Sequence, residues 1–329
     1  MMNYLLKMAA AFIGAALLVN GLCYFYYSPA VQTDNPDKYT EAKNEPSVHN
    51  PHGTEGYGLA VIDDNGFSNA NLFPFKDAEI LCVGSSQTEA QHINWDENYV
   101  YLLNQMAPSY KAYNLGVSGQ RFANSFYRIP ALKEYFPACR ALIFEINAMP
   151  TEKELQQMKT YMEQGEIPVR DLSWKRGNLA LRVIGQVPLC RLLWSQYDHS
   201  RKVENKERPE KVGDSYRELA GEVLALGKEQ AGNISIIIFN LSRLKIEHDG
   251  SVTISADQGE CEAMRIACQE QGISFIDMGE TFLDNYATER VLPYGFANSK
   301  VGVGHLNAYG HRLIADTLQI ALMKEGLGR

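Results

Sequence analysis

The sequence predicts an α/β domain built as a three-layer sandwich, with helices on both faces of a mostly parallel, five-stranded sheet. From residue 79 onward, short apolar runs alternate with longer segments whose apolar residues recur at helical spacing. Strands separated by helices in this order form parallel sheets, because each crossover helix returns the chain to the same end of the sheet. One apolar run near the N-terminus predicts a membrane helix in front of this domain.

Five short, largely uncharged runs supply the predicted strands, and they lie at residues 79–83, 111–115, 141–146, 234–239 and 273–278. Between and after these runs, apolar spacing predicts helices at 96–106, 260–271 and 308–324. The helix at 260–271 is followed by Gly272, a residue that favours the end of a helix. Together these segments account for one α/β domain at residues 77–325.

Residues 151–212 interrupt this alternation. The stretches 155–162 and 179–194 have helical spacing, and 201–211 is a dense run of charges that is typical of a solvated loop. The stretch 179–194 contains arginines and a proline, so a second membrane span is not expected there. We expect a helical insertion that shapes the rim of the active site.

The N-terminal run distinguishes an exported protein from a cytoplasmic one. Residues 8–27 contain no charge, and twenty residues in a helix span roughly the 30 Å of a bilayer core. Ser28-Pro29-Ala30 offers the small residues that a signal peptidase needs, so a cleaved, secreted form remains an alternative. The bulky residues at 23–27 resemble an interfacial aromatic belt and favour an uncleaved anchor at 1–30. In both cases the following domain is extracytoplasmic.

A polar segment at residues 31–76 follows the apolar run. It is interrupted by Asn-Pro and Glu-Pro pairs, which predict a tether and an irregular lead-in to the domain. His49 and His52 lie in this segment. No further metal ligands can be placed beside them, so we expect solvated loop histidines.

Composition excludes several classes of function. The apolar fraction of 45% is enough for a buried core, and the net charge of −8 disfavours a nucleic-acid partner. The six cysteines form no CxxC pair, so we expect buried, unpaired thiols rather than disulfides. Neither a metal-ligand grouping nor a glycine-rich phosphate loop is evident. No cofactor is expected.

Chemically capable residues follow the predicted strands. Open parallel sheets place their sites at the carboxyl ends of the strands. Ser86 follows the first strand, Gly119 the second and Asn147 the third, while His305 lies between the fifth strand and the last helix. These four residues are therefore expected on one rim of the sheet.

The same four residues match the requirements of acyl transfer. A serine hydroxyl needs a base to become nucleophilic, and histidine is the usual base near neutral pH. The oxyanion formed on attack needs hydrogen-bond donors that are already in place. The N–H groups of Ser86 and Gly119 and the side-chain amide of Asn147 are the candidate donors, with Ser86 as nucleophile and His305 as base.

Four blocks of this sequence resemble the SGNH (GDSL-like) hydrolase superfamily. Residues 84–88 (Gly-Ser-Ser-Gln-Thr) resemble its first block, and residues 114–119 resemble the second, whose last glycine lends an oxyanion N–H. Asn147 falls where the third block carries its asparagine, and His305 with the residues after it resembles the fifth block. The resemblance implies a flavodoxin-like SGNH fold and a serine esterase or acyl-transfer enzyme.

The sequence departs from the family pattern at three positions. Ser85 replaces an aspartate beside the nucleophile, and Ala148 stands where an aspartate often follows the asparagine. Gly302 stands three residues before His305, where the family usually keeps the acid that orients the histidine. Either a backbone carbonyl orients His305, giving a Ser–His dyad, or another carboxylate reaches it. The nearest carboxylates at or after the fifth strand are Asp277, Glu280 and Asp284.

Two further histidines, His92 and His311, are not expected to have catalytic roles. His92 lies six residues after Ser86 and could contact substrate, but an exposed loop histidine is the expected interpretation. His311 lies in the last predicted helix, where packing or surface exposure is expected.

The leading functional hypothesis is an ester hydrolase that acts through an acyl-Ser86 intermediate. The resemblance and the export signal together suggest small O-acyl groups, such as acetyl esters of extracellular or cell-wall glycans. The first alternative is an O-acetyltransferase that receives its acyl group from a membrane acyltransferase partner. The second is a non-catalytic glycan-binding protein, which the missing acid at Gly302 motivates.

Overall fold

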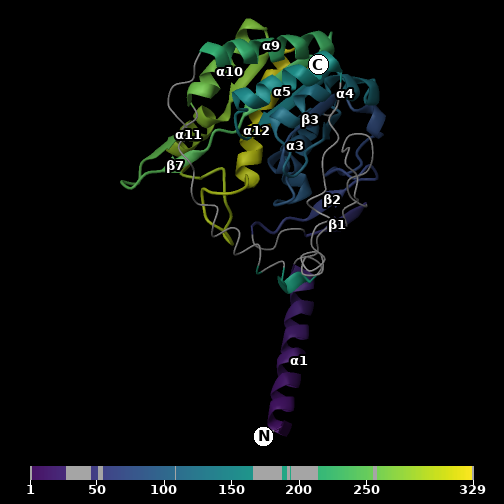
Figure 1. Cartoon of the computed structure of the whole chain (residues 1–329), viewed down its shortest axis with the longest axis vertical. Coiled ribbons are helices and arrows are strands. Elements are labelled where there is room, and N and C mark those ends of the chain that lie inside the picture. Colours follow the sequence, from purple (N-terminus) through teal and green to yellow (C-terminus); the bar gives the residue numbers. More distant parts are fainter. Residues whose placement is uncertain are drawn as a thin grey trace.

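The computed structural model describes residues 2–26, 46–50, 55–107, 109–165, 187–190, 193, 214–254 and 258–327. A central sheet is covered by helices on both faces, and the apolar helix α1 (Met2–Tyr26) stands apart from this domain (Figure 1). The predicted three-layer α/β architecture is confirmed.

The central sheet has five strands, and each adjacent pair is parallel. They are β3 (Ile80–Val83), β4 (Ala112–Asn114), β5 (Ala141–Ile146), β6 (Ser235–Asn240) and β9 (Ser274–Asp277). Their order across the sheet is β4-β3-β5-β6-β9, so the chain moves from β3 to one side and then returns to the other. This reversal between β3 and β5 is the topological switch point at which flavodoxin-like sheets bind ligands. All five predicted strands are present, and their ends differ from the predicted ones by at most one residue.

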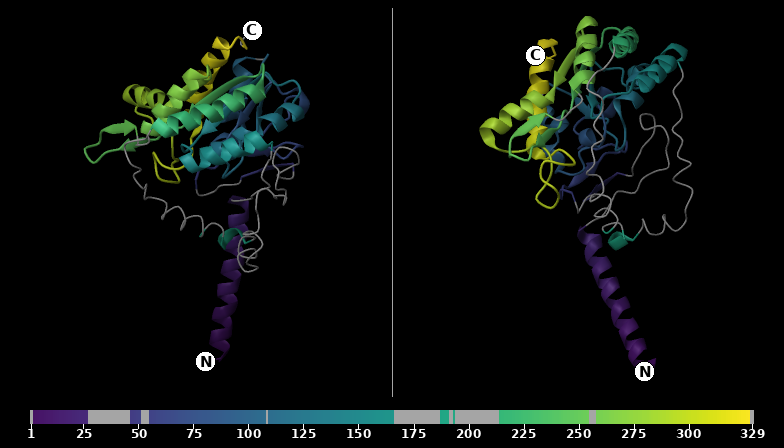
Figure 2. Two further views of the ribbon diagram at one scale, coloured as in Figure 1. Left: turned by 45° about the horizontal axis from the view of Figure 1, so that its top comes forward. Right: turned by 60° about the vertical axis from the view of Figure 1, so that its left-hand side comes forward.

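Helices cover the two faces of the sheet (Figure 2). One face carries α4 (Ile129–Tyr135), α5 (Glu152–Gln164), α9 (Asp214–Ala231) and α10 (Gln258–Glu270). The other face carries α3 (Tyr99–Met106), α11 (Met278–Glu289) and α12 (Ala308–Lys324). Side chains alternate along each strand, so Leu81 enters one core while its neighbour Cys82 enters the other. Both faces of the sheet are covered by helices, as the largely uncharged strand runs predict.

Short elements complete the fold: α2 (Ser86–Glu89), η1 (Phe75–Asp77), η2 (Trp95–Glu97), η3 (Phe122–Asn124) and η4 (Phe126–Arg128). Two antiparallel ribbons lie outside the main sheet. They are β1 (Ser47–His49) with β2 (Ala60–Ile62), and β7 (Leu244–Ile246) with β8 (Val252–Ile254).

The end of the lead-in is fastened to the domain by a buried carboxyl group. Asp63 accepts hydrogen bonds from the N–H of Phe67 at 3.0 Å and of Asn65 at 2.9 Å, and also from the hydroxyl of Tyr113 on β4. Burial raises the pKa of Asp63, although these hydrogen bonds act in the opposite direction. Because of these hydrogen bonds, the end of the lead-in packs against β4 at the edge of the sheet and is not merely a tether.

The expected solvation of the lead-in histidines is wrong for His49. This residue lies in β1 and is buried, because β1 pairs with β2 against the domain. Burial lowers the pKa of His49 to about 4, against the opposing charge of Glu89. His52 and residues 31–45 of the tether lie outside the described residues.

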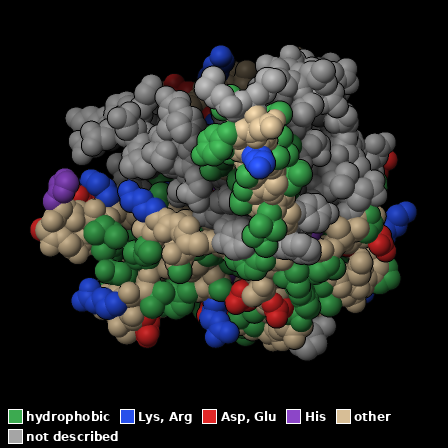
Figure 3. All heavy atoms as spheres, turned by 90° about the horizontal axis from the view of Figure 1, so that it is seen from below, with side chains coloured by type: hydrophobic (Ala, Val, Ile, Leu, Met, Phe, Trp, Pro, Cys, Tyr) green, Lys and Arg blue, Asp and Glu red, His purple; other side chains and the backbone are tan. Residues whose placement is uncertain are grey.

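Helix α1 is long and apolar enough to cross a membrane over Asn3–Cys23, by length and composition. Its apolar side chains are exposed on the side of the molecule from which it projects (Figure 3). The candidate cleavage site at Ser28-Pro29-Ala30 lies outside the described residues.

The six cysteines are free. Of the expected insertion, α5 and the short stretch 187–190 are described.

Candidate active site

Ser86 is the first residue of α2 and follows directly on the tight turn after β3. Ser85 caps this short helix, since its hydroxyl accepts a hydrogen bond from the N–H of Gln87 at 3.2 Å. Every residue from Leu81 to Ala90 except Ser86 is buried. The turn therefore presents one hydroxyl at the carboxyl end of the sheet, as predicted.

A buried carboxyl group on β5 fixes this turn. Glu145 accepts hydrogen bonds from the N–H of Ser85 at 3.1 Å and of Thr88 at 2.9 Å, and from both side-chain hydroxyls. Burial raises the pKa of Glu145, while these four hydrogen bonds oppose the rise. Gly84 is required next to this network, because a Cβ there would lie 2.4 Å from a carboxyl oxygen of Glu145. Strand β5 thus holds the turn that carries Ser86 in place.

His305 reaches Ser86 from the other end of the chain. Its Nε2 lies 2.8 Å from the Ser86 Oγ, although 219 positions separate the two residues. Gln87 holds the histidine loop on both sides: its Oε1 accepts from the N–H of Leu306 at 2.8 Å, and its Nε2 donates to the carbonyl of Gly304 at 3.4 Å. The residue after Ser86 therefore sets the position of His305, a contact that sequence reasoning missed.

The carboxylate behind His305 is Glu55. One oxygen, Oε2, lies 2.9 Å from the His305 Nδ1, and the other accepts the backbone N–H of His305 at 2.6 Å. Its side chain is 13% exposed and that of His305 is 25% exposed. Ser86, His305 and Glu55 form a continuous chain of hydroxyl, imidazole and carboxylate, which is the arrangement by which serine triads are recognised.

Glu55 is held as a carboxylate. Burial acts to raise its pKa, but hydrogen bonds to His305 and the positive charge that His305 and His92 can carry outweigh this effect and lower the pKa to about 2. An ionised acid at this point favours the His305 tautomer with its proton on Nδ1. The Nε2 lone pair is then free to accept the proton of Ser86.

Of the two alternatives for His305, contact with another carboxylate is the one that the structure shows, but the nearest candidates in sequence, Asp277, Glu280 and Asp284, do not make it. Asp277 instead caps α11, where its Oδ1 accepts the N–H of Gly279 at 3.0 Å. Glu280 and Asp284 lie on α11 itself. Glu55 comes from the lead-in, 250 positions before His305. This separation is why a search of the residues around Gly302 does not find it.

Glycines near Glu55 offered a signal that could have found it. A Cβ on Gly56 would lie 2.1 Å from the carbonyl oxygen of His92, and one on Gly58 would lie 2.0 Å from that of Ile93. Both glycines allow the lead-in backbone to lie directly on the residues after α2. A Gly-x-Gly pair in an otherwise polar segment indicates this kind of close approach.

The expectation of an exposed His92 is also wrong, since the side chain is 5% exposed beneath the lead-in. His311 is buried inside the domain, which is one of the two environments expected for it. Its Nδ1 accepts a hydrogen bond from the N–H of Tyr99 at 3.4 Å. The two histidines differ in surroundings. His92 lies against His305 and Glu55, and His311 lies against α3.

Gly304 is a point at which the triad depends on the absence of a side chain. A Cβ there would lie 1.9 Å from Oε1 of Glu55, and the residue has φ +95°. We expect Gly304→Ala to displace the carboxylate and to lower kcat about 10²-fold, the effect of a misplacement of roughly 1 Å. The matched control is Gly250→Ala, which has φ +83° but open space around it. An equal fall in the steady-state kcat of both variants would contradict this expectation.

The predicted oxyanion donors lie at the same edge of the sheet. Gly119 is exposed in the turn after β4 and has φ +77°. Buried Glu89 fixes this turn, because it accepts the N–H and the hydroxyl of Ser118, the former at 2.8 Å. Asn147 follows β5, and its side-chain Oδ1 is buried without a hydrogen-bond partner. An unpartnered amide at the edge of the site is available to a ligand, and its two ends are interchangeable by rotation.

Glu55, His92 and His305 together resemble a metal-ligand set, with ligand atoms within 4.8 Å of one another. The two imidazole rings are stacked, with centroids 3.7 Å apart and planes inclined by 18°. A histidine lone pair lies in the plane of its ring, and two nearly parallel planes do not meet at a nearby ion. The arrangement therefore does not fit a shared metal ion.

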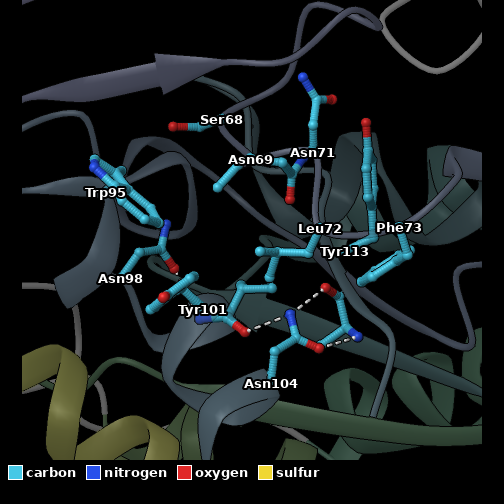
Figure 4. Close-up of a pocket in the computed structure, with 13 residues that line it drawn as sticks. Ser68, Asn69, Asn71, Leu72, Phe73, Trp95, Asn98, Tyr101, Asn104 and Tyr113 are labelled. Carbon is cyan, nitrogen blue, oxygen red and sulfur yellow. Dashed lines mark hydrogen bonds between the residues drawn. The ribbon is translucent and has the colours of Figure 1, made fainter. Parts of the chain in front are cut away.

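A separate small pocket lies between α3, β4 and the loop at 68–73 (Figure 4). Its volume is about 30 Å³, enough for one or two water molecules. Asn104 donates to and accepts from the backbone of Ala112, both at 2.8 Å, and Asn69 bonds the backbone of Asn114. These amides serve the fold, so we assign no ligand to this pocket.

No protein-family model matches the chain, and no curated protein sequence matches it. Among solved structures, a member of the lipolytic G-D-S-L family from Veillonella parvula has 17% identity and a TM-score of 0.40, covering 75% of this chain and 98% of its own. The acetylxylan esterase Axe2 from Geobacillus stearothermophilus has 13% and 0.38, covering 74% and 93%. The acetyl xylan esterase AlAXEase has 14% and 0.41, covering 74% and 99%. Likeness at this level does not identify a reaction.

Proposed function

We propose that this protein is a serine ester hydrolase of the SGNH type that acts through an acyl-Ser86 intermediate. One observation carries the proposal: Ser86, the exposed residue of a buried turn, is joined to His305 at 2.8 Å, and His305 to the ionised Glu55 at 2.9 Å. A nucleophile, a base and an orienting acid in this order are the minimum equipment for acyl transfer.

The proposed first step forms the acyl-enzyme. The Ser86 Oγ attacks the ester carbonyl carbon and its proton passes to the His305 Nε2, giving a tetrahedral oxyanion and an imidazolium beside Glu55. The N–H groups of Ser86 and Gly119 and the amide of Asn147 are the proposed oxyanion donors. When the intermediate collapses, the bond to the leaving alkoxide breaks and the imidazolium proton goes to that oxygen.

The second step regenerates the enzyme. A water molecule gives its proton to the His305 Nε2 and attacks the acyl carbon. Collapse then releases a carboxylic acid, and the proton returns to the Ser86 Oγ. The presence of Glu55 removes the reason for a non-catalytic, glycan-binding interpretation, which depended on a missing acid.

We further propose that the substrates are small O-acyl groups, such as acetyl esters on extracellular or cell-wall glycans. Helix α1 supports a membrane-anchored protein, and the lysine in front of its apolar run supports a domain outside the cytoplasm. An open basin of about 340 Å³, whose lining includes His92 but none of the three triad residues, is the place we propose for the carbohydrate part of the substrate. Tyr57 and Phe296 offer aromatic surface there, and Asn94 and Glu97 offer hydrogen-bonding groups.

The proposal is tested by labelling the full-length protein in detergent with a fluorophosphonate probe. We expect one adduct, located on the Ser86 peptide by mass spectrometry, and no adduct after heat denaturation. Release of acetate from p-nitrophenyl acetate should stop in proportion to labelling. A folded protein that takes up no label, or takes it up on another residue, would contradict the proposal.

The same acyl-enzyme can be resolved by a glycan hydroxyl in place of water, which defines the O-acetyltransferase alternative with a membrane acyltransferase as acyl donor. An assay with an acetyl donor and an unacetylated glycan acceptor separates the two reactions. Hydrolysis predicts free acetate with or without the acceptor. Transfer predicts that the acceptor increases turnover and carries the acetyl group.

A further inference from the structure

His92 is a buried histidine that the proposed reaction leaves without a chemical step. It follows α2 by three residues and lies between the lead-in and the loop that carries His305. Its side chain is 5% exposed. A buried ionisable ring costs desolvation free energy, so its place beside a catalytic base calls for a physical reason.

His92 contacts two members of the triad at once. Its ring is stacked on that of His305, with centroids 3.7 Å apart and an interplanar angle of 18°. Its Nδ1 lies 2.9 Å from the carbonyl oxygen of Glu55. A carbonyl oxygen only accepts hydrogen bonds, so the Nδ1 of His92 carries the proton that it donates there.

The ring of His92 is neutral at any pH near neutrality. Burial lowers its pKa to about 3, the proximity of His305 acts in the same direction, and the carboxylates of Glu55 and Glu89 oppose the shift. A neutral ring matters because His305 becomes an imidazolium during each turnover. Two stacked cations would repel each other, whereas a neutral ring can remain in contact with the charged one.

Glu55 needs such support because it lies on the lead-in and not on the histidine loop. Hydrogen bonds to other segments hold the backbone of the lead-in here. The side chain of Asn298 accepts the N–H of Gly56 at 2.9 Å and donates to the Gly56 carbonyl at 2.8 Å. Further along, the carbonyl of Leu59 accepts the N–H of Trp95 at 2.9 Å. His92 is the member of this set that also touches the catalytic base.

We propose that His92 is a positioning residue that aligns the acid and the base of this site. Its ring face fixes the plane of His305, and its Nδ1–H fixes the backbone of Glu55, so the His305 Nδ1 and the Glu55 carboxylate stay 2.9 Å apart. This inference rests on the proposed serine-esterase function. It predicts that the loss of His92 acts on the turnover of p-nitrophenyl acetate and on the His305–Glu55 contact, and not on the binding of that small ester.

Three variants separate the two contacts. His92→Phe keeps a flat ring against His305 but loses the hydrogen bond to Glu55. His92→Asn keeps a donor for the carbonyl but loses the stacking, and His92→Ala loses both. We expect kcat to fall about 10-fold in each of the first two and about 10²-fold in the alanine variant, the range observed when groups that orient catalytic ligands are removed. KM for p-nitrophenyl acetate, which has no carbohydrate part, should change less than twofold.

The matched control is His311→Ala, which removes a second fully buried histidine that contacts Tyr99 and not the triad. It is expected to lower thermal stability and to leave kcat within about threefold of wild type. Proton NMR of the full-length protein gives a readout independent of substrate. The downfield resonance of the His305 Nδ1–H should shift or broaden in the three His92 variants and persist in the control.

The outcomes distinguish this inference from the function on which it rests. If folded wild type takes up no fluorophosphonate, the esterase proposal fails first. If wild type is labelled and the folded His92 variants keep the wild-type kcat and the wild-type downfield resonance, the esterase proposal stands and the positioning role of His92 is overturned. A fall in kcat that is equally large in His311→Ala would also overturn it.

Discussion

Replacing Glu55 by glutamine is expected to lower kcat about 10⁴-fold, the loss found when the acid of a serine triad becomes an amide. The amide cannot favour the imidazolium that forms when His305 takes the proton of Ser86, and it allows the wrong tautomer of the histidine. KM should change little, because Glu55 faces His305 through both of its oxygens. Steady-state hydrolysis of p-nitrophenyl acetate measures the effect.

Two further variants make this expectation specific. Glu55→Asp keeps the charge but withdraws the carboxylate by roughly 1 Å, for which a loss of about 10²-fold is expected. Asp64→Asn removes an exposed carboxylate from the same lead-in and should leave kcat unchanged. Wild-type turnover in Glu55→Gln would show that His305 works without this acid, as a dyad.

Glu55 also links stability to pH. Its pKa is about 2 in the folded protein against an ordinary value of 4.5, so the unfolded chain binds the proton more readily. The stabilisation is therefore complete above about pH 4.5 and is lost as the pH falls toward 2. Its size is on the order of 3 kcal/mol. Acid unfolding followed by circular dichroism should show a shallower pH dependence in Glu55→Gln than in wild type.

Ser86→Ala is expected to lower kcat about 10⁶-fold and to abolish fluorophosphonate labelling, because the acyl-enzyme cannot form without the Ser86 hydroxyl. The melting temperature should stay close to that of wild type, since the Ser86 side chain is the partly exposed member of its turn. Kinetics and intact-protein mass spectrometry measure both effects.

The neighbouring serine is the matched control. Ser85→Ala loses the helix cap and the hydrogen bond to Glu145, so it should lower the free energy of unfolding by about 1–3 kcal/mol. Labelling at position 86 should persist in that variant. Activity lost in Ser85→Ala but retained in Ser86→Ala would show that the nucleophile is not Ser86.

Local sequence patterns determined the sheet and the rim residues. The strand runs are visible because a strand buried on both faces is mostly apolar, and β5 (Ala141–Ile146) matches its predicted bounds although it contains the buried Glu145. The turn after β3 was predictable because parallel strands end at one edge of the sheet, and the residues after each strand therefore lie at that edge. Ser86, Gly119, Asn147 and His305 were found in this way.

Only the tertiary structure decided the acid behind His305 and the surroundings of that histidine. Glu55 and His92 lie in segments without periodicity, and each resembles, locally, part of a polar, solvated stretch. Their burial arises because the lead-in packs over the residues after α2 and against the His305 loop, a contact between segments up to 250 positions apart. Residue spacing reports which face of an element is buried, whereas the meeting of two irregular segments depends on how the whole chain packs.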